Sequence, residues 1–160
     1  MKRQILTAAA VLALSAPAFA DDAPAVKEID VTFDITAIES PTAAEFWGQL
    51  EGDLETAILK RITGQIADEG AEVTIDVDEF DMSSTFQAAL GADSTLTGDV
   101  AIKSMIDSTV DTFYTLTITL RDAGILTEQD GQIVATSIPL DEAYAAMINT
   151  FADNVAEKLK

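Results

Sequence analysis

The sequence predicts an α+β fold: a two-layer sandwich in which two helices cover one face of a mostly antiparallel sheet of four to five strands. Three observations lead to this prediction. Several segments alternate apolar and polar residues with the period of a strand, two others carry apolar stripes with the period of a helix, and the order is β-α-β-β-β-β-α. Two helices with one apolar stripe each can cover only one face of a sheet, so we expect the other face to be wet.

The first twenty residues predict a secretory signal peptide. Lys2 and Arg3 form a positively charged start, residues 5–14 form an apolar run, and Ala18-Phe19-Ala20 is a small-x-small cleavage site. The run is about half as long as the roughly 20 apolar residues that a membrane-spanning helix needs. We therefore expect cleavage after Ala20 and a periplasmic protein.

The rest of the chain predicts one acidic domain. We expect residues 21–27 to be a disordered leader and residues 28–160 to form a single domain. Loss of the two basic residues with segment 1–20 changes the net charge from −19 to −21, and a field of that sign repels nucleic acid and anionic membranes. The chain contains no cysteine, which excludes a disulfide framework and a lipid-modified N-terminal cysteine. No second long apolar run follows, so we expect the cleaved protein to be soluble.

The first strand is predicted at 28–36, where polar and apolar residues alternate strictly. The expected inner residues are Ile29, Val31, Phe33 and Ile35, and the expected outer ones Glu28, Asp30, Thr32, Asp34 and Thr36.

A helix is predicted to begin at Thr42, because Thr42 and Glu45 have the spacing of a capping box. We expect a bend at Gly64 and the helix stop at Gly70. Its apolar stripe consists of Phe46, Trp47, Leu50, Leu54, Ala57 and Ile58.

Four more strands and a closing helix follow. In the second strand the alternation of Val73, Ile75 and Val77 slips before Phe80, which predicts a bulge at Asp78-Glu79. Later strands are predicted at 95–103, 114–121 and, after the hairpin turn signal Asp130-Gly131, at 133–138; the helix follows at 140–159. The expected common core comprises Val31, Phe33, Leu50, Leu54, Val73, Ile75, Leu116, Ile118, Tyr144 and Phe151.

The stretch VTIDVDEFDM, residues 73–82, holds four carboxylates in ten positions. Read as a calcium loop from Asp76, it has Phe80 at position 5, Asp81 at position 6 and Gln87 at position 12, where oxygen ligands, glycine and glutamate are required. We therefore interpret it as the wet side of a strand.

Two of these carboxylates, Asp76 and Asp78, are expected on the same strand face about 7 Å apart. As an alternative to the wet strand, they could share a cation with Asp99 or Asp34 of a neighbouring strand. The whole wet face is expected to hold Asp30, Asp34, Thr36, Thr74, Asp76, Asp78, Thr97, Asp99, Thr115, Thr117 and Thr119.

Catalysis is not expected. The chain has no histidine and no cysteine, so the commonest general base, the thiol nucleophile and imidazole metal ligands are missing. A catalytic carboxylic acid needs an apolar pocket to raise its pKa, whereas the acids here alternate outward. We assign no catalytic, cofactor-binding or metal-ligating residue, and we expect no cofactor.

The C-terminal third places a strand ending in Leu-x-Asp, a turn with glycine, a second strand and an amphipathic helix in succession. The positions that carry this pattern are Leu120, Asp122, Gly131, Ile133 and Ala135. Here the chain resembles the end of the small α/β domain of periplasmic envelope-assembly proteins, such as the curli-secretion lipoprotein and the penicillin-binding-protein activators. The resemblance implies topology more than function, and no functional residue is carried over.

Two functions remain open. The first is a soluble, non-enzymatic periplasmic module that binds an envelope protein or other component through an exposed sheet face or edge. The alternative is an acidic-surface protein that binds a small molecule or a divalent cation through Asp76, Asp78 and Asp99. The sequence does not indicate the partner or the oligomeric state.

Overall fold

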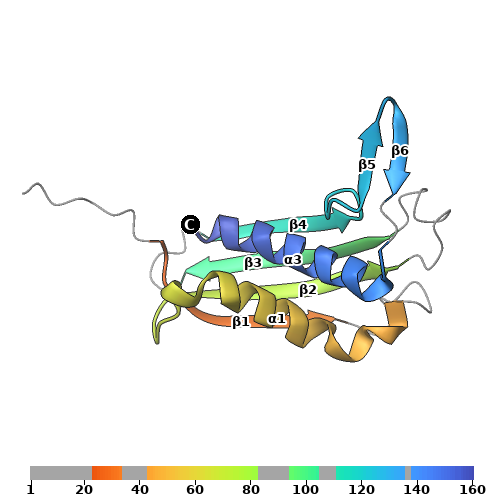
Figure 1. The fold of residues 1–160 in the computed structure, drawn as a ribbon. Helices are drawn as coiled ribbons and strands as arrows, with labels where there is room; N and C mark the ends of the chain where they lie inside the picture. The colour runs from red at the N-terminus through yellow and green to blue at the C-terminus, as the bar shows by residue number, and fades with distance from the viewer. Residues whose placement is uncertain (1–22, 34–42, 83–93, 105–110, 136–137) are drawn as a thin grey trace, which may run out of the picture.

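The computed structural model describes residues 23–33, 43–82, 94–104, 111–135 and 138–160. Two layers are visible in Figure 1: a sheet, and two helices that lie side by side on one of its faces. The strands of the sheet are β1 (Val26–Phe33), β2 (Ala71–Asp81), β3 (Thr95–Ser104) and β4 (Thr112–Thr119), in that spatial order. The helices are α1 (Leu50–Arg61) and α3 (Leu140–Lys158). The predicted fold class and element order are confirmed.

The sheet is mixed because α1 connects two parallel strands. β1 and β2 pair in parallel, with Val31 beside Ile75, whereas β2–β3 and β3–β4 are antiparallel. The parallel pair agrees with the rule that a strand–helix–strand crossover joins parallel neighbours.

The core lies between the sheet and the helices. Each strand sends alternate side chains into it, and both helices contribute their apolar stripes. Of the ten expected core residues, eight are buried, while Phe33 and Leu116 are partly buried and pack against the others. The largest fully buried side chains include Phe80, Phe151, Leu50, Leu54, Ile75 and Met147.

Polar contacts join the two helices to each other. Arg61 of α1 donates a hydrogen bond of 2.6 Å to Asp153 of α3, and its guanidinium also donates to the carbonyl of Asn149. Tyr144 of α3 donates its hydroxyl to Asp53 of α1 at 2.9 Å. These contacts hold α1 and α3 against each other.

The predicted bulge in β2 is confirmed. The register runs from Val77 opposite Gly98 to Glu79 opposite Thr97, so Asp78 is the extra residue. Without this extra residue Phe80 would point outward, because one residue of slip reverses the face of every later side chain. With it, Phe80 is buried.

The predicted helix is shorter than expected. α1 begins at Leu50 and is preceded by 3-10 turns at Ala43–Glu45 and Trp47–Gln49, while the capping residue predicted at Thr42 lies outside the described residues. Gly48, the middle residue of the second 3-10 turn, has low helix propensity. At the other end α1 stops at Arg61, and a separate 3-10 turn contains Gly64.

The prediction that Gly70 ends this helix is wrong. Gly70 lies beside the start of β1, where a Cβ atom would be 2.3 Å from the carbonyl oxygen of Ala25. Ala71 donates its N–H to that same carbonyl at 2.8 Å. β1 therefore begins at Val26, which is fully buried, so the end of the expected 21–27 leader belongs to the sheet. The expected signal segment 1–20 lies outside the described residues.

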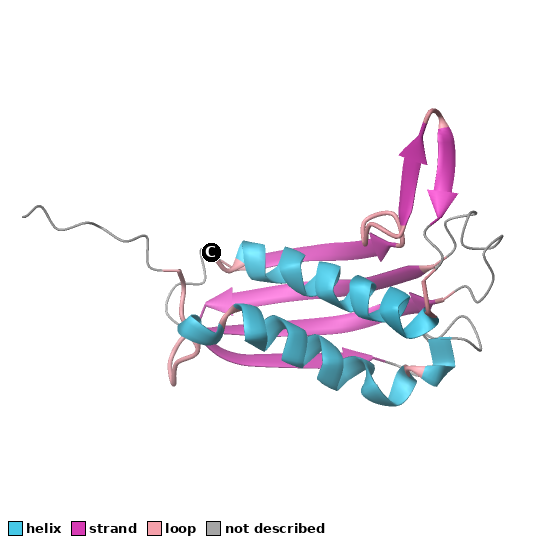
Figure 2. Ribbon diagram, in the orientation of Figure 1, coloured by secondary structure: helices cyan, strands magenta, loops and turns pink. Residues whose placement is uncertain are grey.

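The last predicted strand does not join the sheet. It forms β6 (Gln132–Ala135), which pairs only with β5 (Leu126–Gln129) in a separate hairpin. Asp130 and Gly131 have φ angles of 51° and 77°, the left-handed conformations that a two-residue hairpin turn requires. Figure 2 shows this hairpin standing off one end of the sheet. None of the described helices is long and apolar enough to cross a membrane.

Candidate functional site

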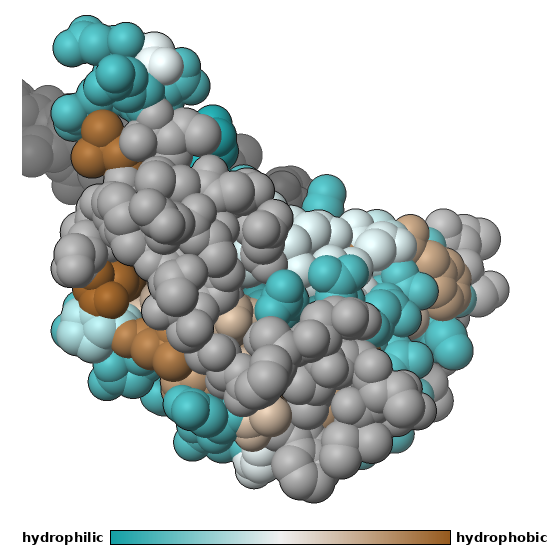
Figure 3. Space-filling model, turned by 90° about the vertical axis from the view of Figure 1, so that its right-hand side faces the viewer, coloured by the Kyte–Doolittle hydropathy of each residue, from teal (hydrophilic) through white to brown (hydrophobic). Residues whose placement is uncertain are grey.

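The outer face of the sheet, defined as the face opposite the helices, is the candidate site. The side chains that alternate with the core residues reach water there. On the right of Figure 3, the side opposite the helices, the described surface is mostly hydrophilic to neutral, with a hydrophobic patch at its edge. Its exposed members include Asp30, Thr74, Asp76, Asp78, Asp99, Thr115 and Thr117, as the alternation predicts.

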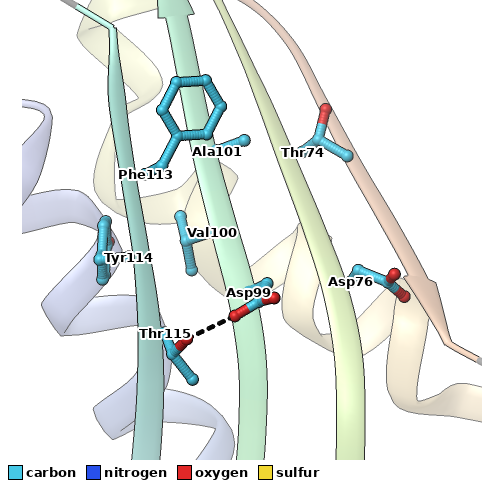
Figure 4. Close-up of a pocket in the computed structure, with 8 residues that line it drawn as sticks. All are labelled: Thr74, Asp76, Asp99, Val100, Ala101, Phe113, Tyr114 and Thr115. Atoms are coloured by element: carbon cyan, nitrogen blue, oxygen red, sulfur yellow. Dashed lines mark hydrogen bonds between the residues drawn. The ribbon is translucent and has the colours of Figure 1, made fainter.

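A depression of about 390 Å³ lies on this face across β2, β3 and β4. Phe113 stands at one end of it with 63% of its surface exposed. Asp76 and Asp99 lie toward the other end, as Figure 4 shows. The remaining lining comes from Thr74, Val100, Ala101, Tyr114 and Thr115. An exposed aromatic ring and two carboxylates therefore share one shallow surface.

The register explains why the two carboxylates lie close together. Asp76 is directly opposite Asp99 in the antiparallel β2–β3 pair, and opposing side chains in such a pair have Cβ atoms about 4.5–5.5 Å apart. The bulge adds Asp78 to the same neighbourhood. Local desolvation, followed by the charges of Asp99 and Asp76, raises the pKa of Asp78 above its usual value, while a backbone hydrogen bond from Asp99 opposes the shift.

Hydrogen bonds between side chains cross the strands on this face. Thr115 donates to Asp99 at 2.5 Å, and Thr97 and Thr117 are hydrogen-bonded at 3.0 Å. Thr95 donates to Glu79 at 2.6 Å. These hydrogen bonds fix the orientation of the side chains on the outer face, although the face is exposed to water.

Positive charge is scarce around the depression. Lys103 places its ammonium nitrogen 6.0 Å from the centre of the Phe113 ring, at the limit of a cation–π contact. Lys27 is paired with Glu72 at 2.7 Å on the β1 side of the sheet. Asp76 and Asp99 are thus left without a cationic partner among the described residues.

The structure brings together three of the four carboxylates that the sequence singled out: Asp76, Asp78 and Asp99. Asp34 lies outside the described residues. Within the described ranges, no three acidic side chains are placed so that they could hold one metal ion.

Phe113 is the residue that sequence reasoning missed. Segment 104–113 fits neither helical nor strand periodicity well, so it carries no prediction. The signal was the pattern of β4 itself: since Tyr114, Leu116 and Ile118 point inward, extending the alternation by one residue places Phe113 outward.

No protein-family model and no curated protein sequence matches the chain. Among solved structures, it is similar to protein XCC0632 from Xanthomonas campestris, described as a member of the family DUF330, with 14% identity, a TM-score of 0.51, and coverage of 90% of this chain and 88% of that one. A point variant of the PelC dodecamer from Paraburkholderia phytofirmans matches with 10% identity, a TM-score of 0.46 and coverage of 84% and 88%. A minor lipoprotein from Acinetobacter baumannii matches with 11% identity, a TM-score of 0.34 and coverage of 82% and 91%.

The likeness to the Xanthomonas campestris protein extends over most of the chain, whereas the sequence suggests a resemblance only in the C-terminal third. The whole α+β sandwich is the shared feature. At this level of identity the likeness concerns the fold alone, and function has to be argued from the site.

Proposed function

We propose that this chain is a non-enzymatic periplasmic binding module, whose outer sheet face docks a positively charged segment of an envelope protein. The observation that carries the proposal is the exposed ring of Phe113 beside Asp76 and Asp99 in one depression. Export is supported by the signal-like segment 1–20.

The chemistry of the depression favours a cationic side chain. A guanidinium group can stack on an aromatic ring while it donates hydrogen bonds to a carboxylate, which an ammonium group does less well. Thr115 holds Asp99 in place, so the carboxylate is oriented before a ligand arrives. The negative net charge, −19 for the full chain and −21 after loss of Lys2 and Arg3, adds long-range attraction for any basic partner.

A binding role also agrees with the lack of suitable acid–base catalysts among the described residues of this face. Its carboxylates are exposed, and the chain has no histidine to serve as a base near neutral pH. Asp78 has a raised pKa, but its surroundings are other carboxylates on an open face instead of an enclosed pocket.

Divalent-cation binding is the second candidate, because one observation favours it. After desolvation, the charges of Asp99 and Asp76 also raise the pKa of Asp78, so both carboxylates repel the ionised Asp78. A bound cation would relieve that repulsion. Two or three carboxylates on an open face leave most of the six to eight calcium ligands to water, so we expect a weak and unselective interaction.

Calorimetric titration separates the two candidates. The probe is an extended ten-residue peptide with alternating arginine and threonine, titrated in parallel with calcium chloride and with sodium chloride of equal ionic strength. We expect saturable peptide binding that Phe113→Ala and Asp99→Asn each weaken about 5- to 10-fold, in line with about 1 kcal/mol for a cation–π or exposed ionic contact.

Asp30→Asn is the matched control, since Asp30 is exposed on the same face but lies outside the depression. Peptide binding that is equally weakened by Asp30→Asn would reduce the interaction to net charge and contradict the proposed site. A one-site calcium isotherm with micromolar affinity, abolished by Asp76→Asn, would favour the cation-binding function instead.

A further inference from the structure

The two edges of the sheet differ in how they are protected. An edge strand exposes unpaired N–H and C=O groups, and proteins usually guard it with charges, proline or a covering side chain. β1 carries Lys27, Glu28 and Asp30, and its Val31 N–H is covered by Glu55 of α1 at 3.4 Å. The sequence of β4 is TFYTLTIT, which has no charge, no proline and no glycine, and consists of residues that favour strands.

The hydrogen bonds at the end of β4 show which backbone groups face the open edge. Thr119 donates its N–H to Asp122 and accepts a bond from the N–H of Ala123, so its backbone points away from β3. Backbone groups alternate sides along an antiparallel strand. The N–H and C=O groups of Phe113, Thr115 and Thr117 therefore also point to the open edge, where no hydrogen bond within the described residues satisfies them.

The two ends of β4 differ in charge: lysines outnumber the one acidic neighbour, Asp111, at its beginning, and acidic residues dominate beyond its end. Near its beginning lie Lys103, over the ring of Phe113, and Lys158, whose ammonium is 5.9 Å from the ring centre of Tyr114; Lys160 follows at the end of the chain. The hairpin that follows the other end carries Glu128 and Asp130, and Arg121 lies 3.9 Å from Glu128 and only partly offsets it.

We infer that two copies of this chain pair through β4, antiparallel and two-fold symmetric, to form one continuous eight-stranded sheet. Antiparallel pairing sets the basic end of each strand against the acidic end of the other, twice per dimer. A register that places Thr115 opposite Thr117 of the second copy aligns the outward-facing backbone groups of both strands.

The hairpin supports a second copy as the occupant of this edge. In Figure 1 it rises past β4, and in Figure 3, where it is the topmost part of the described chain, it lies toward the helix side. A two-fold axis through the paired strands puts each hairpin beside the C-terminal end of α3 of the other copy. Glu128 and Asp130 then face Lys158 and Lys160, which gives the hairpin a role that the isolated chain does not explain.

Charge exchange tests the pairing. Sedimentation velocity of the purified protein should show a dimer. Glu128→Lys with Asp130→Lys, or Lys158→Glu with Lys160→Glu, should each raise the dimer dissociation constant at least 10-fold. The protein that carries all four substitutions should recover dimerisation, because the opposite charges again face each other. A folding defect would not be repaired in this way.

Thr115→Pro tests the main-chain contact. It removes an N–H that faces the open edge, a position where a sheet tolerates proline, so circular dichroism should still report a folded monomer. Three results would overturn the inference. The wild-type protein could be a monomer at 100 µM, Thr115→Pro could leave the dimer intact, or the protein with all four charge substitutions could fail to dimerise. Because the charge-exchange substitutions lie outside the depression on the outer face, peptide binding there is scored separately.

Discussion

The inner and outer faces of the sheet are made by the same strands, yet they have opposite physical roles. On the inner face, side chains such as Ile75 and Val100 lie under the helices and are almost completely buried. On the outer face, threonines and carboxylates form hydrogen bonds across the strands and remain in water. We therefore expect stability and the proposed recognition to be separable: burial on the inner face should supply most of the free energy of folding, and substitutions on the outer face should leave the protein folded.

The largest effect is expected on the inner face. Phe151→Ala removes a fully buried ring and should lower the free energy of unfolding by about 3–5 kcal/mol, through lost burial and the cavity left behind. Urea denaturation measures the loss. Phe113→Ala on the outer face is the matched control and should change stability by less than about 0.5 kcal/mol, since its ring is mostly exposed. Similar losses for both variants would contradict the division between the faces.

A smaller loss is expected where β1 meets β2. Gly70→Ala places a Cβ atom 2.3 Å from the backbone oxygen of Ala25, and the backbone shift should cost about 1–3 kcal/mol. Gly64→Ala is the control, because its Cβ would have no atom within 4 Å. We expect the control to unfold at the same urea concentration as the wild type or a higher one. Equal stability of the two variants would show that the contact at Gly70 is easily relaxed.

The next effect in size is expected between the helices. Tyr144→Phe removes the hydroxyl that donates to Asp53 and should lower stability by about 1 kcal/mol at neutral pH. Adding Asp53→Asn to Tyr144→Phe should then cost little more, because the two groups act as a pair. Full additivity in this double-mutant cycle, measured by thermal denaturation, would mean that the contact contributes nothing of its own.

The smallest effect is expected on the outer face and depends on pH. The pKa of Asp78 is raised in the folded protein, so the folded state holds this proton more tightly than the unfolded state does. The contribution of Asp78 to stability should therefore fall as pH rises from its unfolded pKa through its folded one. Asp78→Asn should stabilise the protein at pH 7 by a few tenths of a kcal/mol and have little effect at pH 3, as screened surface charges do.

Salt provides a second measurement on the same carboxylates. Wild-type stability should rise smoothly with sodium chloride, and calcium chloride of equal ionic strength should give a similar rise. A saturable stabilisation specific to calcium, lost in Asp76→Asn, would sharpen the outer face into a cation site, because only binding to the folded state produces that saturation.

Local sequence patterns predict much of this arrangement. The alternation in β2 and β3 assigns each residue to a face because side chains of a strand point to opposite sides by turns. The slip between Val77 and Phe80 predicts the bulge at Asp78 because only an extra residue restores the inward direction. The pair Asp130-Gly131 predicts the hairpin turn because few other residues accept positive φ angles. By the same alternation, the sequence also places Asp76, Asp78 and Asp99 on the exposed face.

Tertiary structure decided the features that depend on distant partners. The local sequence predicts that Gly70 ends a helix. In the structure Gly70 instead packs against the backbone of Ala25, which is 45 positions away and comes close only when β1 pairs with β2. The strand after the Asp130-Gly131 turn reads as a member of the sheet, yet it pairs only with β5. Phe113 of β4 and Asp76 of β2 line the same depression because both strands pair with β3. Local patterns depend on the geometry of one strand or helix, whereas these contacts depend on which elements pair, and periodicity does not encode pairing.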